Sequence, residues 1–161
     1  MAAEKSNKDA ELFAKYLEGK KILIADTGAA NRSSLFKIFQ DLGAKQQQLV
    51  MVNNFKQAEA QIQQIKPHIV IAEYDLGRRC GLDLLQAQRL QNPEETKQMI
   101  FVVVTGNTSQ SAVARAAEED IDAYILKPYT LESVRKILLK AAIAKINPPE
   151  YRVTIEKGKE A

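Results

Sequence analysis

The chain has 161 residues, 45% of them apolar, which is enough for one compact domain with short extensions. Its net charge of +3, with both signs interspersed, argues against the strongly basic surface of a nucleic-acid-binding protein. The sequence shows neither an apolar run of about 18 residues, as a membrane span requires, nor a secretory signal. The one cysteine, Cys80, cannot form an internal disulfide, and we therefore expect a cytoplasmic protein.

The first elements in chain order are a short helix and then a strand followed by a helix. Apolar residues at helical spacing predict an amphipathic helix over Asn7–Gly19, in an N-terminal extension of residues 1–19. A buried strand over Lys21–Asp26 comes next. It leads into a helix that we expect to be capped near Asn31 and to end at Gly43.

The second strand and helix follow directly. The apolar run Gln48–Val52 predicts a short strand, and Asn53 or Asn54 is expected to cap the next helix. The residues of that helix expected on one apolar side are Phe55, Ala58, Ile62 and Ile65.

Ile69–Glu73 has the length and β-branched content of a strand buried on both faces, and it predicts the central strand of a parallel sheet. Two acids, Glu73 and Asp75, stand where this strand ends. A helix is predicted from Gly81, with a break at Pro93 after it. The residues expected to face inward from that helix are Leu82, Leu85 and Leu90.

Two further strands complete the pattern. The longest apolar run, Met99–Thr105, predicts a fourth strand, and a weakly amphipathic helix is expected over about Ser109–Glu119. Asp122–Leu126 predicts a fifth strand, after which Thr130 is expected to cap a long helix. Residues 147–161 are predicted to be a linker or the start of a following helical module.

Five alternations of strand and helix predict an α/β fold with a doubly wound parallel sheet in residues 20–146. Right-handed crossovers bring the carboxyl ends of all strands to one edge, which is where such sheets bind ligands. The side chains expected at this edge are Asp26, Thr27, Glu73, Asp75, Thr105 and Lys127.

Four motifs, in this order and at suitable spacings, resemble those of a response-regulator receiver domain over about residues 20–145. They are the Ile-Leu-Ile-Ala-Asp26 strand with Arg32 beyond it, the Ile-Val-Ile-Ala-Glu73 strand with Gly81-Leu82 beyond it, Val-Val-Val-Thr105-Gly106, and Ala-Tyr124-Ile-Leu-Lys127-Pro128. The resemblance implies a (βα)5 flavodoxin-like fold with strand order 2-1-3-4-5. It also implies a bacterial signalling domain of the two-component type that acts through protein–protein contact and is not an enzyme.

In that family, two acids after the first strand bind Mg²⁺, an Asp ending the third strand accepts a phosphoryl group, and a hydroxyl and a lysine hold the phosphate. An aromatic residue in the fifth strand turns inward when the phosphoryl group is present. The resemblance assigns the first acid, the hydroxyl, the lysine and the aromatic switch to Asp26, Thr105, Lys127 and Tyr124.

Two positions depart from the family pattern. Thr27 stands in place of the second acid, which weakens the magnesium site, so we expect no bound cofactor. Asp26 and Glu73 could still hold a weakly bound Mg²⁺, but we expect none at physiological concentration. Glu73 stands in place of the phosphoacceptor and is longer by about 1.3 to 1.5 Å, which predicts a poor acceptor. We expect its carboxylate to take the place of phosphoryl oxygens and to pair with Lys127 and Thr105. These changes predict a pseudo-receiver that works without phosphorylation.

Other interpretations remain open from the sequence. Asp75 or Glu73 would be the acceptor in a working two-component receiver, and Glu73 would point into solvent if the pocket were vestigial. A doubly wound phosphatase-type hydrolase would use Asp26 as nucleophile, although such enzymes place a second acid where Gly28 stands. The resemblance also implies protein partners or a homodimer at the face of the fourth helix, fifth strand and fifth helix. The residues expected on that face are Tyr124, Ala112, Ala116 and Arg135.

Overall fold

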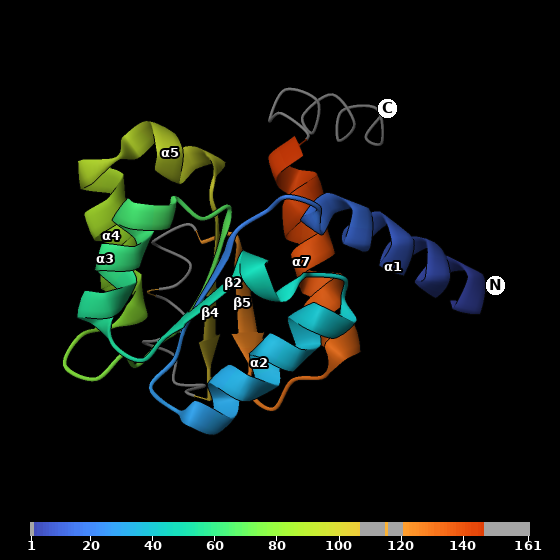
Figure 1. The fold of residues 1–161 in the computed structure, drawn as a ribbon, viewed down its shortest axis with the longest axis horizontal. Coiled ribbons are helices and arrows are strands. Elements are labelled where there is room, and N and C mark those ends of the chain that lie inside the picture. The colour runs from blue at the N-terminus through green and yellow to red at the C-terminus, as the bar shows by residue number, and fades with distance from the viewer. Residues whose placement is uncertain (1, 107–114, 116–120, 147–161) are drawn as a thin grey trace.

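The computed structural model describes residues 2–106, 115 and 121–146 (Figure 1). The elements of the first half are α1 (Ala2–Leu17), β1 (Ile22–Ala25), α2 (Ala29–Asp41), the 3-10 turn η1 (Gln46–Gln48), β2 (Leu49–Val52) and α3 (Phe55–Ile65). Those of the second half are β3 (Ile69–Glu73), α4 (Gly81–Gln91), α5 (Pro93–Gln98), β4 (Ile100–Thr105), β5 (Ala123–Leu126) and α7 (Leu131–Ile146). The predicted helix over Ser109–Glu119 and the tail 147–161 lie outside the described residues.

The strands form one parallel sheet in the order β2-β1-β3-β4-β5. Ile22 of β1 lies opposite Leu49 of β2 on one side and Ile69 of β3 on the other. This order confirms the predicted (βα)5 flavodoxin-like architecture, and it makes β1 and β3 interior strands whose carboxyl ends lie side by side.

Side chains alternate along each strand between two cores, because successive residues of a strand point to opposite faces of the sheet. Ile22 and Ile24 pack with α1, α2 and α7 on one face, whereas Leu23 and Ala25 pack with α3 and α4 on the other. The helices are seen on the two sides of the strands in Figure 1. Interior strands of this kind are buried on both faces, which is why they read as unbroken apolar runs.

The helix α1 is integrated into the first of these cores. Phe13 and Leu17 are 0% exposed and pack with residues of the sheet, of α2 and of α7. The first half of α1 extends away from these contacts and projects past α7 (Figure 1). Within the described ranges, no helix is both long and apolar enough to cross a lipid bilayer.

Several predicted helix ends and faces are wrong. α1 begins at Ala2, not Asn7, and α2 is preceded by Gly28 as its N-cap, not capped near Asn31. The break predicted after α4 is present at Asn92, but Pro93 then begins a further helix, α5, that was not predicted, because proline suits the first turn of a helix. Leu90 is 86% exposed instead of facing inward.

Two predicted caps are confirmed. The Asn54 side chain accepts a hydrogen bond from the Gln57 backbone N–H at 2.8 Å, at the start of α3. The Thr130 hydroxyl accepts one from the Ser133 N–H at 3.1 Å, at the start of α7. Both side chains accept hydrogen bonds from backbone N–H groups that have no partner within the helix, because they lie in its first turn.

Candidate functional site

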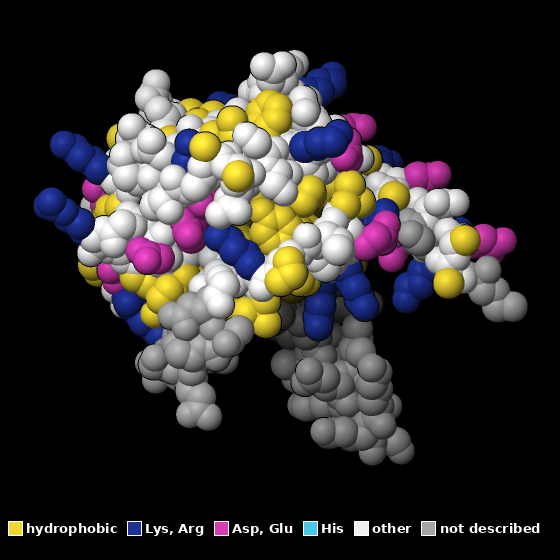
Figure 2. Space-filling view, turned by 90° about the horizontal axis from the view of Figure 1, so that it is seen from below, with side chains coloured by type: hydrophobic (Ala, Val, Ile, Leu, Met, Phe, Trp, Pro, Cys, Tyr) yellow, Lys and Arg dark blue, Asp and Glu magenta, His cyan; other side chains and the backbone are white. Residues whose placement is uncertain are grey.

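The site lies at the carboxyl edge of the sheet. Asp26 follows β1, Glu73 ends β3, Thr105 ends β4 and Lys127 follows β5, so each side chain comes from a different strand. Asp26 is 1% exposed, and the side chains of Glu73 and Lys127 are 16% and 23% exposed. Figure 2 views the molecule from this edge, and acidic and basic side chains lie next to one another near its centre.

Glu73 is held by two neighbours. Its Oε2 accepts hydrogen bonds from the backbone N–H and from the hydroxyl of Thr27, each at 2.9 Å. Its Oε1 lies 3.4 Å from Nζ of Lys127, so the predicted contact with Lys127 is present. The hydroxyl that donates to Glu73 is that of Thr27, whereas the prediction named Thr105. The carboxylate therefore points into the site, and the alternative in which it points into solvent is wrong.

The tight packing of Gly81 helps to fix the backbone at Glu73. A Cβ at position 81 would come within 2.3 Å of the carbonyl oxygen of Glu73. The N–H of Gly81 donates to the carbonyl of Tyr74 at 2.7 Å. Glycine at the start of α4 thus allows this helix to approach the end of β3 closely.

Asp26 provides the second carboxylate of the site. Its Oδ1 accepts hydrogen bonds from the Gly28 N–H at 2.8 Å and from Asn31 Nδ2 at 3.4 Å. Its buried Oδ2 has no hydrogen-bond partner among the described residues and lies 3.6 Å from Nζ of Lys127. Lys127 therefore lies between two carboxylates, each of which supplies it with a counter-charge.

This arrangement does not fit a magnesium ion. Oδ1 of Asp26 and Oε2 of Glu73 already accept two hydrogen bonds each. The remaining two oxygens, Oδ2 of Asp26 and Oε1 of Glu73, both face the Lys127 ammonium, which lies where a cation would need to bind. Mg²⁺ also requires near-octahedral oxygen ligands. Within the described part of the chain, no group of three or more metal-ligating side chains is found.

Thr105 and Tyr124 form a second pair beside this cluster. Thr105 is 4% exposed, and its side chain is hydrogen bonded to the Tyr124 side chain. Burial raises the pKa of Tyr124, the nearby Tyr74 raises it further, and the hydrogen bond with Thr105 acts in the opposite direction. The backbone N–H of Lys127 donates to the Thr105 carbonyl at 2.9 Å. The predicted switch residue is thus linked to the pocket through Thr105.

Asp75 lies apart from the Asp26–Glu73–Lys127 cluster. It is exposed, and its Oδ1 accepts a hydrogen bond from the Gly77 N–H at 3.1 Å. Together with Glu73 and Thr105 it lines a neighbouring cavity of about 400 Å³. The visible role of its side chain is to shape the loop between β3 and α4.

The predicted partner face is only partly described. Ala112 and Ala116 lie outside the described residues. Arg135, which we expected on the surface of that face, is 9% exposed and forms an ion pair with Glu132. Tyr124 is half-buried.

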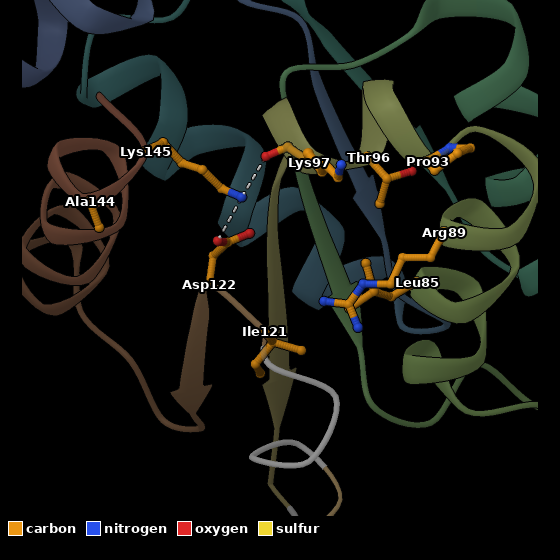
Figure 3. A pocket seen from close by; sticks show the side chains of 9 residues that line it. All are labelled: Leu85, Arg89, Pro93, Thr96, Lys97, Ile121, Asp122, Ala144 and Lys145. Atoms are coloured by element: carbon orange, nitrogen blue, oxygen red, sulfur yellow. Dashed lines mark hydrogen bonds and ion pairs between the residues drawn. The ribbon is translucent and has the colours of Figure 1, made fainter. Parts of the chain in front are cut away.

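A cavity of about 550 Å³ at the opposite edge of the sheet contains none of the predicted site residues (Figure 3). The hydrogen bonds and the ion pair among its lining residues connect neighbouring helices and strands of the fold. Asp122 accepts a hydrogen bond from the Phe101 N–H at 2.7 Å and lies 3.1 Å from Nζ of Lys145. Lys145 also donates to the Lys97 carbonyl at 2.8 Å, which ties the end of α7 to β5 and α5.

Comparisons with known proteins find relatives with the same fold. The chain is 29% identical over 115 residues to a probable chemotaxis protein CheY of Rhizobium etli, covering 71% of this chain and 86% of that one. It is 25% identical over 126 residues to chemotaxis protein CheY-3 of Vibrio cholerae, covering 74% and 89%. The structure of Vibrio cholerae CheY4 superposes with a TM-score of 0.67 at 20% identity, covering 76% of this chain and 98% of that one.

The family model described as "Response regulator receiver domain" matches residues 22–139. The match begins after α1 and takes in all five strands of the sheet. Since it covers well over half of the sequence, the chain belongs to the response regulator receiver domain family.

Proposed function

We propose that this chain is a pseudo-receiver, a signalling domain that binds partner proteins without being phosphorylated. The observation that carries the proposal is that both oxygens of the Glu73 carboxylate are already in contact with donors, from Thr27 and Lys127. Members of the receiver family act in signalling through partner proteins. In this chain the internal carboxylate takes over part of the role that a phosphoryl group has in a phosphorylated receiver.

The imitation is partial for electrostatic reasons. A carboxylate has one negative charge and two oxygens, whereas a phosphoryl group has nearly two charges and three oxygens. Hydrogen bonds to charged groups contribute about 1.5 to 3 kcal/mol each. If two conformations differ in free energy by a few kcal/mol, such a contact changes their relative populations but does not eliminate either conformation. We therefore propose that Glu73 biases the domain toward one conformation and does not lock it there.

The same contacts make Glu73 a poor phosphoacceptor. Attack on phosphorus requires a free carboxylate oxygen in line with the leaving group. Oε2 accepts two hydrogen bonds from Thr27, and Oε1 faces Lys127. Phosphorylation would have to break one of these sets of contacts and also accommodate the longer side chain.

A hydrolase that uses Asp26 as nucleophile is disfavoured by the burial of this residue. Asp26 is 1% exposed, and its two oxygens face hydrogen-bond donors on one side and Lys127 on the other. A substrate phosphate would have to displace Lys127 before it could reach the carboxylate.

The phosphorylation test compares the wild type with the double variant Thr27→Asp/Glu73→Asp, which restores the family pattern. Both proteins are incubated with acetyl phosphate and Mg²⁺, and the intact masses are measured. We expect an unchanged mass for the wild type. A stoichiometric phosphoryl adduct at Glu73 or Asp75 of the wild type would refute the proposal and support the working-receiver alternative.

The partner test uses the intact protein as bait in its own cell extract. Capture by the wild type is compared with capture by Glu73→Ala and Lys127→Ala, and with the exposed-acid control Glu18→Ala. We expect the first two variants to lose a partner that the control retains. If all four proteins capture the same partners equally, Glu73 and Lys127 do not control the binding surface.

A further inference from the structure

A groove of about 750 Å³ lies between the first turns of α1 and the side of α7 that faces them. α1 precedes the receiver match, which begins at residue 22, so one wall of the groove is built by an element outside the family model. In Figure 1 the first half of α1 projects beyond the body of the domain next to α7. The groove is therefore a feature of this chain and not of the receiver family as a whole.

The floor of the groove is one side of α7, on which lysine and apolar side chains alternate at helical spacing. α7 contributes Lys136, Leu139, Lys140 and Ile143, which are spaced i, i+3, i+4 and i+7 and so lie on one stripe of the helix. Ile143 is 43% exposed, which is high for a large apolar side chain. Such a stripe matches the packing surface that one helix offers to another.

The walls of the groove carry an excess of positive charge. Four basic and two acidic side chains line it, which gives a local net charge of +2. Arg135 and Glu132 form an ion pair with each other. Lys5, Lys136 and Lys140 have no ion pair in the part of the chain that the structure describes.

The first turns of α1 have little to hold them in the described structure. Phe13 and Leu17, near the end of α1, are 0% exposed, whereas residues 2–5 are exposed. Short helices without a packing partner are marginal in water, because few hydrogen bonds offset the cost of ordering the backbone. A ligand that packs between α1 and α7 would bury the inner side of this projecting segment.

We infer that the groove between α1 and α7 binds an acidic amphipathic helix of a partner protein. The apolar side of that helix would pack on Ile143, beneath which Leu139 is 7% exposed, and its carboxylates would lie against Lys5, Lys136 and Lys140. The inference rests on the proposed function only in taking a partner protein as the occupant. It does not require Glu73, which lies at the carboxyl edge of the sheet.

The test measures binding of a synthetic 16-residue helical peptide with leucines on one face and glutamates elsewhere. Its control has the same leucines with lysines in place of the glutamates. Fluorescence anisotropy gives the affinity, and amide chemical shifts of labelled protein locate the site. We expect the acidic peptide to bind more than tenfold tighter than the basic one and to shift amides of residues 2–9 and 136–143. Added salt should weaken this binding.

Variants separate the groove from the receiver pocket. Lys136→Glu/Lys140→Glu should weaken the acidic peptide about tenfold or more, whereas Lys56→Glu, at an exposed position of α3, should leave its affinity unchanged. The acetyl phosphate test of the pseudo-receiver proposal uses the same wild-type protein and does not involve the groove, so a failure of the groove is distinguished from a failure of the pseudo-receiver proposal.

Four results would overturn the inference. They are no binding of the acidic peptide at millimolar concentration, equal binding of both peptides, binding that the groove variants do not change, and shifts located outside the groove. Binding of phosphatidylserine vesicles in place of the acidic peptide would assign the groove to a membrane surface. Self-association abolished by Lys136→Glu/Lys140→Glu would assign it to a second copy of the chain.

Discussion

Replacing Lys127 by methionine removes the cation that lies between Asp26 and Glu73, 3.6 Å and 3.4 Å from their oxygens. Oδ2 of Asp26 is buried and has no hydrogen-bond partner among the described residues, so the variant leaves this charge uncompensated. Breaking a buried ion pair in this way costs about 3 to 5 kcal/mol. Because the Lys127 side chain is 23% exposed, water screens part of the effect, and we expect a loss of about 2 to 3 kcal/mol.

The assay is equilibrium unfolding in urea at neutral pH, followed by circular dichroism. A loss of this size corresponds to a decrease in melting temperature of about 5 to 10 °C for a domain of this length. The double variant Lys127→Met/Glu73→Gln removes one of the two repelling carboxylates, and it should recover about 1 kcal/mol of the loss. Lys56→Met, at an exposed position of α3, serves as the control and should change stability by less than about 0.5 kcal/mol.

A loss below about 0.5 kcal/mol in Lys127→Met would mean that the carboxylates at this edge do not depend on Lys127 for their counter-charge. Equal stability of the single and double variants would mean that Asp26 and Glu73 do not repel each other measurably when Lys127 is absent.

Three further predictions follow from packing and protonation. Gly81→Ala places a Cβ 2.3 Å from the Glu73 carbonyl oxygen and should cost about 2 kcal/mol or more in urea unfolding, whereas Gly106→Ala meets open space and should cost far less. Phe13→Ala should cost about 3 to 5 kcal/mol because this side chain is 0% exposed, and Leu12→Ala, at a position 51% exposed, should cost under about 1 kcal/mol. The pKa of His68 is lowered from 6.5, first by burial and then by neighbouring lysines. The unfolded chain therefore binds the proton more readily, so stability should fall as pH decreases below 6.5, and His68→Gln should flatten this dependence in urea unfolding at several pH values.

The sheet and its functional edge were predictable because the interior parallel strands are buried on both faces. Unbroken apolar runs such as Ile69–Glu73 and Met99–Thr105 indicated strands β3 and β4 to within one residue at each end. Once the strands are placed, crossover handedness alone brings Asp26, Glu73 and Lys127 to one edge. These three side chains lie near one another in the structure because the order and handedness of the strands place them at the same edge.

The role of Thr27 could not be predicted in the same way. The sequence showed only that an acid of the family pattern is missing, since the direction of a hydroxyl depends on the path of the loop between β1 and α2. The structure gives the missing information: both donors of Thr27 point to Glu73. An acid at this position would instead place two carboxylates next to each other, so the two departures from the family pattern are compatible with one another.

The prediction that Leu90 of α4 faces inward is wrong, because an apolar residue faces the core only if its angle around the helix places it there. Leu90 follows Leu85 by five positions, which is about 140° around a helix, and it lies on the solvent side. Gln88, three positions after Leu85, is 0% exposed instead. Its amide oxygen accepts hydrogen bonds from Gln63 at 3.3 Å and from Asn92 at 3.4 Å, so a polar side chain occupies the inner position.

The central claim is that Glu73 gives Lys127 a built-in counter-charge and leaves no place for a phosphoryl group. The most direct measurement is the amide spectrum of labelled wild-type protein with and without beryllofluoride and Mg²⁺, next to the Thr27→Asp/Glu73→Asp variant. We predict that the amides of Thr105, Tyr124 and Lys127 do not shift in the wild type but do shift in the variant. Saturable shifts of these amides in the wild type would contradict the account.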